Sequence, residues 1–261
     1  MTSLPIQAMI LAAGRGERMR PLTDRMPKPL LAVRGKPLMQ WPLEALRRGG
    51  FARVVVNTAW LGEQIETRFG SVLMLQPALN EPEKLLNQEQ IQIAYSHEGR
   101  DFGGALETAG GVVRALPQLG ERFWVLAGDV FAPDFVFAQD AVDRFTASCK
   151  LAHLWLVPNP AHNPLGDFGL GDGGLALNLP HDDARPRYTY STIGLYHRDL
   201  FAAPWCDIPA GNPHGIKAPL APLLRAAMDN ALVSAELYRG AWTDVGTPER
   251  LQWLNRVIEP D

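Results

Sequence analysis

The chain has 261 residues, a length that permits one sizeable hydrophobic core and fits a single α/β domain. Its hydrophobic content of 46% and charged content of 20% are ordinary for a soluble protein, and no run approaches the roughly 20 apolar residues of a membrane-spanning helix. The formal net charge of −3 gives no reason to expect a nucleic acid as partner. Without a signal-peptide pattern or metal-ligand spacing between Cys149 and Cys206, we expect a cytoplasmic enzyme or binding protein.

The first predicted element is a buried strand from Ala8 to Leu11, an apolar run typical of parallel sheets. A glycine-containing loop follows, where the backbone can turn tightly and present its N–H groups to an anion. Four cations lie in or just after this loop: Arg15, Arg18, Arg20 and Lys28. A glycine turn with cations after a first strand is typical of a polyphosphate site, although a surface turn with incidental arginines would carry the same pattern.

Two familiar phosphate-binding motifs do not fit this loop. The dinucleotide fingerprint needs a third glycine three residues after its second, but Met19 stands three residues after Gly16, which disfavours a dehydrogenase. A Walker A loop needs Gly-Lys-Ser/Thr, and the only Gly-Lys pair is followed by Pro37. The stretch instead resembles the sugar-nucleotide pyrophosphorylases (nucleotidyltransferases), whose signature L-A-A-G-x-G-x-R-M-x-P-L-T, then P-K-P, matches residues 11–23 and 27–29.

That resemblance implies transfer of a nucleotidyl group from a nucleoside triphosphate to a sugar 1-phosphate, with release of pyrophosphate. It implies that Arg18 and Lys28 are catalytic and clamp the triphosphate. The nucleotide-binding residues that it implies in the loop are Leu11, Ala12, Ala13, Gly14, Arg15, Gly16 and Glu17. No Ser-His or Cys-His nucleophile is evident, and none is needed, because the sugar phosphate oxygen is the nucleophile.

Helices and strands alternate along the rest of the chain. Residues 36–48 predict a helix, residues 53–58 a valine-rich buried strand, and residues 61–69 an amphipathic helix. Further strands are predicted at 72–75, 91–95, 123–127, 150–157 and 188–196, and further helices at 112–116, 219–231 and from Pro248, with Thr247 as N-cap. This order predicts an α/β fold: a doubly wound, mostly parallel, Rossmann-like sheet with helices on both faces.

Residues 76–90 interrupt the pattern. The stretch from Leu79 to Gln90 contains a proline, three glutamates and several amides, and it exceeds the usual length of a connection. It is either functional or tolerated at the surface, and we favour a surface insertion. The family that the chain resembles has a short connection here. We therefore predict one domain over residues 1–261 with a surface insertion at 76–90.

A second segment resembles the part of the family that reads the base and lies against the sugar. Leu106 to Gly110 is similar to the family's L-[GE]-T-[AG]-G loop. The resemblance implies nucleotide binding by Glu98, Gly99 and Gly110, and sugar binding by Glu107. A glycine-rich turn that merely precedes a helix is the alternative.

Asp129 follows Gly128 at the carboxyl end of the predicted strand 123–127, where ligands of open α/β sheets gather. Mg²⁺ prefers carboxylate oxygen and is shared with substrate phosphates, although an aspartate at a strand end can also be a helix N-cap. The resemblance implies Asp129 as one Mg²⁺ ligand and places Gly128 in the sugar site. It implies Asp244, in a segment similar to W-x-D-[VI]-G-T, as the second ligand. Ala127 departs from the family, which often has a polar residue there.

The segment from Asn159 to Phe168 reads N-P-x-H-x-x-x-G-D-F. It resembles the muramic acid phosphate uridylyltransferase branch and implies UTP, N-acetylmuramic acid 1-phosphate and a cell-wall recycling route. Asp167 is the candidate that accepts hydrogen bonds from sugar hydroxyls. The lactyl carboxylate of this acceptor would be costly to desolvate without a cationic partner. The candidate partners are Arg185, Arg187, Arg239 and His162, the last of which has no companion for a zinc site.

Other functions stay open at this point. A transferase for mannose or glucose 1-phosphate with GTP or dTTP, or for phosphocholine with CTP, would keep the nucleotide half. A catalytically silent regulatory homologue would bind a nucleotide-sugar without turnover, but the presence of Lys28 and both aspartates argues against it. The chain is expected to be a monomer or a homodimer.

Overall fold

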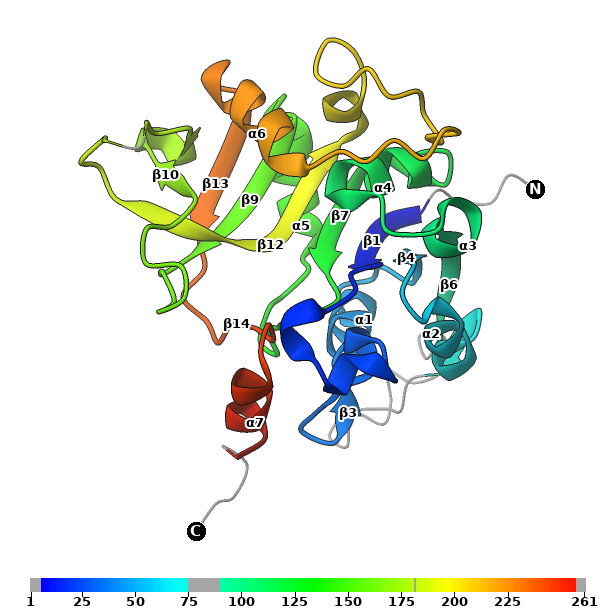
Figure 1. Ribbon diagram of the computed structural model, residues 1–261. Coiled ribbons are helices and arrows are strands. Elements are labelled where there is room, and N and C mark those ends of the chain that lie inside the picture. Colours follow the sequence, from blue (N-terminus) through cyan, green and yellow to red (C-terminus); the bar gives the residue numbers. More distant parts are fainter. Residues whose placement is uncertain (1–5, 75–89, 181, 257–261) are drawn as a thin grey trace, which may run out of the picture.

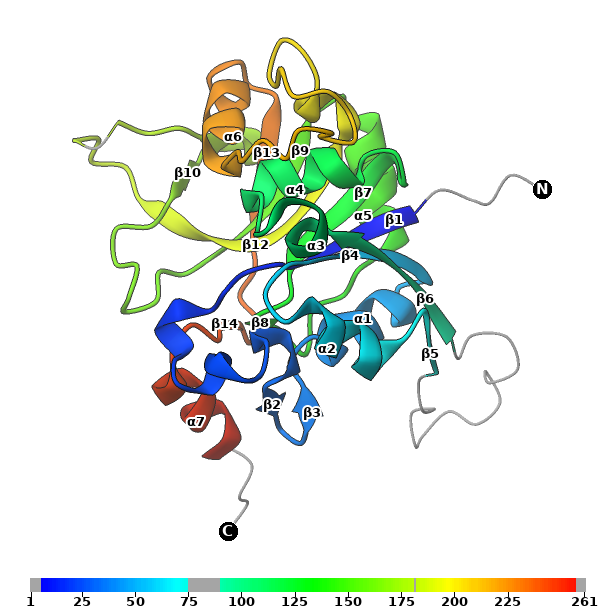
Figure 2. The same cartoon turned by 45° about the vertical axis from the view of Figure 1, so that its right-hand side comes forward.

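The computed structural model describes residues 6–74, 90–180 and 182–256, and Figures 1 and 2 show it from two sides. The α-helices are α1 (Gln40–Arg48), α2 (Gly62–Phe69), α3 (Glu98–Phe102), α4 (Glu107–Ala115), α5 (Gln139–Ala147), α6 (Leu220–Asp229) and α7 (Pro248–Arg256). The short 3₁₀ helices are η1 (Glu17–Met19), η2 (Leu22–Asp24), η3 (Lys28–Leu30), η5 (Asp172–Gly174) and η6 (Arg198–Phe201). The strands are β1 (Ile6–Ala12), β2 (Ala32–Val33), β3 (Lys36–Pro37), β4 (Arg53–Thr58), β5 (Val72–Met74), β6 (Gln90–His97), β7 (Leu119–Ala127), β8 (Val130–Phe131), β9 (Ala152–Val157), β10 (Phe168–Leu170), β11 (Ala176–Leu177), β12 (Arg187–His197), β13 (Val233–Leu237) and β14 (Thr243–Asp244).

The described strands include a ten-stranded sheet whose centre is parallel. Strands β7, β1, β4 and β6 lie side by side in that order and run in the same direction. On one flank β12 is antiparallel to β7, and it also pairs with β9 and β10. On the other flank β5 is antiparallel to β6. The sheet is therefore mixed and mostly parallel at its centre, which confirms the predicted α/β class.

Helices cover both faces of the central strands, as a doubly wound fold requires. Met9, Val55 and Val125 belong to the buried cluster that includes α4 and α6. Their neighbours Ile10 and Val56 belong to a second cluster with α1, α2 and α5. Because successive side chains of a strand point to opposite faces, a strand buried on both sides must be apolar throughout. Figure 2 shows α4 and α6 above the sheet and α1 and α2 below it.

Two predicted helix starts are wrong. The helix expected over residues 36–48 begins only at Gln40, because Lys36 and Pro37 form β3 and pair with β2. The helix expected from Val112 begins earlier, at Glu107, so most of the predicted loop is the first turn of α4. The predicted insertion at 76–90 lies outside the described residues, except for Gln90, which is the first residue of β6. None of the helices in the described ranges is long and apolar enough to cross a membrane.

Candidate functional site

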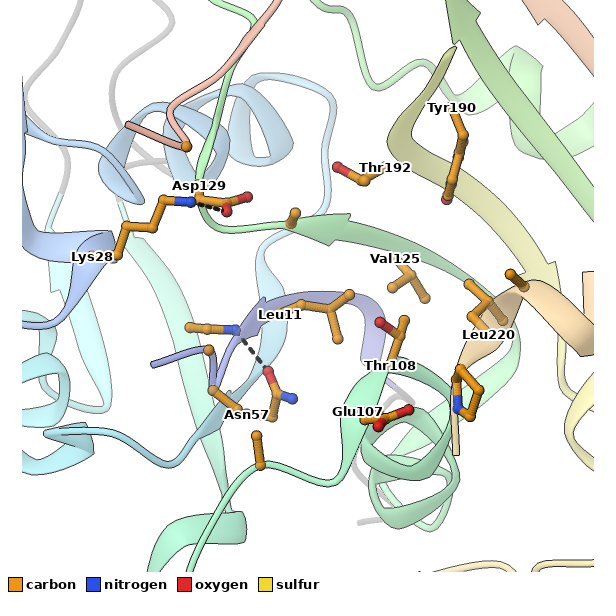
Figure 3. Close-up of a pocket in the computed structure, with 18 of the residues that line it drawn as sticks. Leu11, Lys28, Asn57, Glu107, Thr108, Val125, Asp129, Tyr190, Thr192 and Leu220 are labelled. Carbon is orange, nitrogen blue, oxygen red and sulfur yellow. Dashed lines mark hydrogen bonds and ion pairs between the residues drawn. The ribbon is translucent and has the colours of Figure 1, made fainter. Parts of the chain in front are cut away.

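A pocket of about 810 Å³ lies where β1 and β7 end. The chain proceeds from β1 to β4 and β6 on one side and then returns to β7 on the other side of β1, so the strand order reverses between β1 and β7. Ligands of open α/β sheets bind outside the carboxyl ends of strands at such a switch point. Leu11 of β1 and Val125 of β7 both line the pocket (Figure 3).

Most of the predicted site residues line this one pocket. They are Leu11, Ala12, Ala13, Gly14, Gly16, Glu17, Arg18, Lys28, Glu98, Glu107, Asp129 and Asp167. The predicted site residues outside the lining are Arg15, Gly99, Gly110, Gly128 and Asp244. Lining residues that the sequence did not reveal include Asn57, Thr108, Tyr190, Thr192, Leu220 and Arg225.

Gly16 fixes the turn that follows β1. Its φ of +69° is left-handed, and a Cβ built there would lie 3.0 Å from the Thr23 methyl group, so a side chain would be strained in both respects. The Thr23 hydroxyl and the Met19 N–H both donate to the Gly16 carbonyl, at 2.8 and 2.9 Å. Within the described part of the chain, no atom lies within 4 Å of a Cβ built on Gly14. The loop is therefore held by its own bonds and leaves room for a ligand at Gly14.

Arg15 and Arg18 of the loop have different surroundings. Arg15 donates to the Thr23 carbonyl at 2.9 Å and to Asp24 at 3.1 Å, and its guanidinium lies 3.6 Å from the centre of a Trp60 ring. The hydrogen bond from Arg15 lowers the pKa of Asp24 below its usual range. Arg15 thus stabilises the loop from outside the pocket. Arg18 is exposed, lines the pocket and has no ion pair with a residue that the structure describes, so its charge is available to a phosphate.

Lys28 lines the pocket together with Arg18. It lies in η3 between two prolines, its side chain is only 11% exposed, and its ammonium forms an ion pair with Asp129 (Figure 3). Although Lys28 is charged and stands between two prolines, it is buried. Its ammonium is nevertheless at the pocket wall, where it can meet an anion.

The two predicted metal ligands are brought together by a short strand pair. Residue Asp244 in β14 stands opposite Val130 in β8, and the Val245 N–H donates to the Asp129 carbonyl at 2.9 Å. Asp129 lines the pocket, whereas the Asp244 carboxylate contacts Arg250 of α7 and lies 3.0 Å from His162 Nε2. The main chains of the two aspartates are therefore neighbours despite their distance in sequence.

The chemistry of these two carboxylates fits Mg²⁺, which is often held by one or two carboxylates together with substrate phosphates and water. Over the residues that the structure describes, no cluster of three or more His, Cys, Asp or Glu forms a complete metal site. The remaining ligands would therefore come from substrate and solvent.

Glu98 connects three segments at the pocket. It is fully buried, and it accepts hydrogen bonds from the Asn57 amide at 2.6 Å and from the Leu106 N–H at 2.8 Å. Asn57 in turn accepts from the Ala12 N–H at 2.7 Å (Figure 3). Burial raises the pKa of Glu98 above its ordinary value. The carboxyl group therefore holds the end of β1 and the start of α4 in fixed positions.

The predicted glycines outside the lining are sites of close backbone packing. A Cβ on Gly99 would lie 2.6 Å from the Ala59 carbonyl oxygen, and one on Gly110 would lie 2.5 Å from the Ile216 carbonyl oxygen. A Cβ on Gly128 would lie 3.1 Å from the Leu11 carbonyl oxygen. Close packing within the protein therefore explains why glycine is needed at these positions, and no ligand contact is required to explain it.

The far end of the pocket lies against β12 and α6. Figure 3 shows Tyr190 and Leu220 on the side opposite Lys28. Asp167 accepts from the Tyr190 N–H at 2.8 Å and from the Asn163 amide at 3.2 Å, which fixes its carboxylate. Thr192 lines the pocket at the irregularity where β12 shifts register, with a left-handed φ of +62°. A β-branched residue in that conformation is strained, a feature that concentrates at functional sites.

The arginines expected to bind an acceptor carboxylate lie elsewhere. Arg185 pairs with Asp183 at 2.7 Å, and the hydrogen bond from Arg185 lowers the pKa of Asp183 to about 2. Arg187 donates to main-chain carbonyls, and Arg239 is exposed outside the lining. The arginine that lines the far end of the pocket is Arg225 of α6.

Comparison with known proteins agrees with this geometry. Residues 7–259 match the model of the nucleotidyl transferase family. The chain is 43% identical to the N-acetylmuramate alpha-1-phosphate uridylyltransferase of Neisseria meningitidis serogroup B, over 95% of this chain and 96% of the relative. It is 36% identical to the protein of the same name from Caulobacter vibrioides, over 95% of each chain. It is 38% identical to the UTP–glucose-1-phosphate uridylyltransferase of Synechocystis, over 97% of this chain and 63% of the relative.

A solved structure shows the same fold. A Bacillus anthracis protein described as a glucose-1-phosphate thymidylyltransferase superposes with a TM-score of 0.73 at 19% identity, over 96% of this chain and 94% of that one. The family match spans nearly the whole chain, and the pocket at the switch point carries the family's signature loop. The chain therefore belongs to the nucleotidyl transferase family and is an enzyme of that class.

Proposed function

We propose that the protein catalyses Mg²⁺-dependent transfer of a uridylyl group from UTP to N-acetylmuramic acid 1-phosphate, giving a UDP-sugar and pyrophosphate. The observation that carries the proposal is that one pocket joins the loop after β1 and the Lys28–Asp129 pair to the Asp167 end. Similarity to the two uridylyltransferases named for this acceptor supports the choice of sugar and base.

In this reaction a phosphate oxygen of the acceptor attacks the α-phosphorus of UTP. A new P–O bond forms while the bond to the bridging oxygen of the β-phosphate breaks, and the electron pair leaves with pyrophosphate. Catalysis depends on in-line positioning and on neutralisation of the growing charge. Arg18 and Lys28 supply positive charge, and the backbone around Gly14 supplies N–H donors. Asp129 and Asp244 would hold Mg²⁺, whose charge would offset that of the phosphates.

The sugar would lie at the end formed by Asp167, Tyr190 and Glu107. An ionised carboxylate accepts several O–H bonds, which suits a hydroxyl-rich ligand. Glu98 acts by positioning the loop, since both of its oxygens already accept hydrogen bonds within the protein. We further propose that the chain is a single domain, a cytoplasmic monomer or homodimer, and that it acts in recycling of cell-wall sugars without nucleic acid or membrane partners.

The second candidate is a uridylyltransferase for glucose 1-phosphate. The 38% identity to the enzyme of that name favours it. This alternative keeps the triphosphate end of the pocket and changes only the acceptor.

The test is pyrophosphate release measured over a grid of UTP, GTP, dTTP and CTP against several sugar 1-phosphates, each with and without Mg²⁺. We expect turnover with UTP and N-acetylmuramic acid 1-phosphate that a chelator abolishes. Turnover with another triphosphate would contradict the choice of UTP as the nucleotide donor. Turnover without a divalent cation would contradict the proposed requirement for Mg²⁺. Absence of release in every combination would contradict the activity.

A further inference from the structure

Arg225 is a cation at the end of the pocket away from the triphosphate loop. It lies on α6, one turn after the lining residues Leu220 and Ala221, and it lines the pocket itself. The other cations in the lining, Arg18 and Lys28, belong to the loop end. Arg225 has no role in the uridylyl transfer step proposed for this pocket.

The guanidinium is held in place by neutral groups. One terminal nitrogen donates to the Asn178 side-chain oxygen at 2.6 Å, and the other lies 3.5 Å from the Asp167 main-chain oxygen. Its central carbon lies 5.0 Å from the centre of the Phe168 ring. No carboxylate within the described ranges comes within ion-pair distance of it. Its charge is therefore oriented without being neutralised.

Asn178 is fixed in the orientation that this arrangement needs. Its amide nitrogen donates to both carboxylate oxygens of Asp229, at 3.0 and 3.2 Å. The amide oxygen must consequently face Arg225. Asp229 thus orients the guanidinium through Asn178 and leaves its positive charge unpaired.

Asp167, an acidic residue of the pocket beside Arg225, does not serve as its counter-ion. The Asp167 carboxylate accepts from Tyr190 and Asn163, and only its main-chain oxygen faces Arg225. A guanidinium carries five N–H donors, and only two of its nitrogens are engaged here, one of them in a long contact. Donors remain for a bidentate contact with a planar anion.

From this geometry we infer that Arg225 binds a carboxylate carried by the acceptor sugar and selects acceptors that have one. The inference rests on the proposed function, because it assigns a partner to the lactyl carboxylate of N-acetylmuramic acid 1-phosphate. A carboxylate entering the pocket loses water and needs a positioned cation in return. A neutral acceptor would leave the guanidinium without that partner, so the same residue would disfavour neutral sugars.

The test compares kcat/KM for N-acetylmuramic acid 1-phosphate and N-acetylglucosamine 1-phosphate at saturating UTP, in the wild type, R225M, R225Q and R225K. Methionine keeps the aliphatic part of the side chain and removes the charge. Glutamine keeps hydrogen bonding, and lysine keeps the charge without the planar guanidinium group. The control is R185M, which removes an arginine that is paired with Asp183 and lies outside the pocket. Thermal unfolding of each variant reports on the fold.

We expect R225M and R225Q to lose about 10- to 100-fold in kcat/KM for the carboxylate acceptor, whereas kcat/KM for the neutral acceptor should stay equal or rise. R225K should retain an intermediate preference, and R185M should match the wild type. Equal losses on both acceptors, or an unchanged preference, would overturn the role of Arg225 and leave the proposed function standing. A wild type that prefers the neutral acceptor would overturn both the choice of acceptor and the inference.

Discussion

Lys28 and Asp129 form an ion pair at the end of the pocket that we propose binds the triphosphate. Replacing Lys28 with alanine removes the charge and leaves Asp129 without its partner. Because the Asp129 side chain is 35% exposed, water can solvate it, and we expect stability to change by about 1 kcal/mol or less. Turnover should fall by about 100-fold, since charge developing on the phosphates loses a fixed cation. Steady-state kinetics and thermal unfolding measure the two effects. Collapse of stability with full specific activity in the surviving fraction would make Lys28 a structural residue.

Asp129 and Asp244 are the proposed metal ligands. Asp→Asn at either position keeps the size of the side chain and removes the charge that a hard cation requires. We expect activity to fall by at least about 100-fold, which corresponds to roughly 2.7 kcal/mol of transition-state stabilisation. The matched control is Asp207→Asn, at an exposed aspartate outside the pocket, which should retain activity. Near-normal Mg²⁺-dependent turnover in either ligand variant would contradict the assignment.

Glu98 makes the free energy of unfolding depend on pH, and the direction of its pKa shift sets the sign of that dependence. Because burial raises its pKa in the folded state above the ordinary value of 4.5, the folded protein binds this proton more tightly than the unfolded chain does. Glu98 therefore makes stability decline as pH rises above about 4.5 toward the raised pKa. Glu98→Gln removes this titration and costs a constant amount, because one of the two donors loses its acceptor.

Denaturant unfolding of wild type and Glu98→Gln between pH 4 and pH 8 measures this effect. The advantage of the wild type over the variant should shrink as pH rises. An advantage that grows with pH would mean that the hydrogen bonds from Asn57 and Leu106 outweigh burial and lower the pKa instead.

At the scale of elements, β5 and β6 frame the predicted insertion. They are antiparallel, and Met74 stands directly opposite Gln90, so the two chain ends at the insertion are already adjacent. Replacing residues 75–89 with a two-residue Asn-Gly turn should therefore preserve the sheet, because closing a shorter loop costs little chain entropy. We expect kcat/KM within about twofold of the wild type and an unchanged circular dichroism spectrum. An unfolded product, or loss of activity together with an altered oligomeric state, would show that the insertion contributes to folding or function.

The elements that the sequence predicts best are those whose identity depends on local pattern. A strand that is covered on both faces is apolar at successive positions, so the run Val54-Val55-Val56 predicts a buried strand. Thr247 followed by Pro248 predicts the start of α7. The Arg250 N–H lies 3.4 Å from the Thr247 hydroxyl, as an N-cap requires. The pairing of β3 with β2, which delays α1, depends on tertiary contacts that no local pattern reveals.

The residues of the site also divide into those that a local pattern predicts and those that only the fold brings together. The loop residues around Gly14 have a recognisable spacing, so their place in the pocket was predictable. Arg225 has no such signal, because an arginine on an amphipathic helix is most often solvated. Only the fold, which brings α6 to Asp167, reveals its position at the pocket wall.

At the level of the whole molecule, we propose that this one pocket transfers a uridylyl group to a carboxylate-bearing sugar phosphate. The residues proposed for the reaction lie after β1, in η1 and η3, after β7, before β10, in β12 and β14, and on α4 and α6, and only the folded chain joins them. An acceptor that reaches from Lys28 to Arg225 would use the whole length of the pocket.

The most direct measurement is a one-pot competition. The wild type receives UTP, Mg²⁺ and equal concentrations of the 1-phosphates of N-acetylmuramic acid, N-acetylglucosamine, glucose and mannose, and the UDP-sugars formed early are quantified by mass spectrometry. Their ratios equal the ratios of kcat/KM, so differences in enzyme concentration cancel. We predict that UDP-N-acetylmuramic acid exceeds each other product by about tenfold or more. A main product that carries an uncharged sugar would show that the pocket does not select a carboxylate-bearing acceptor.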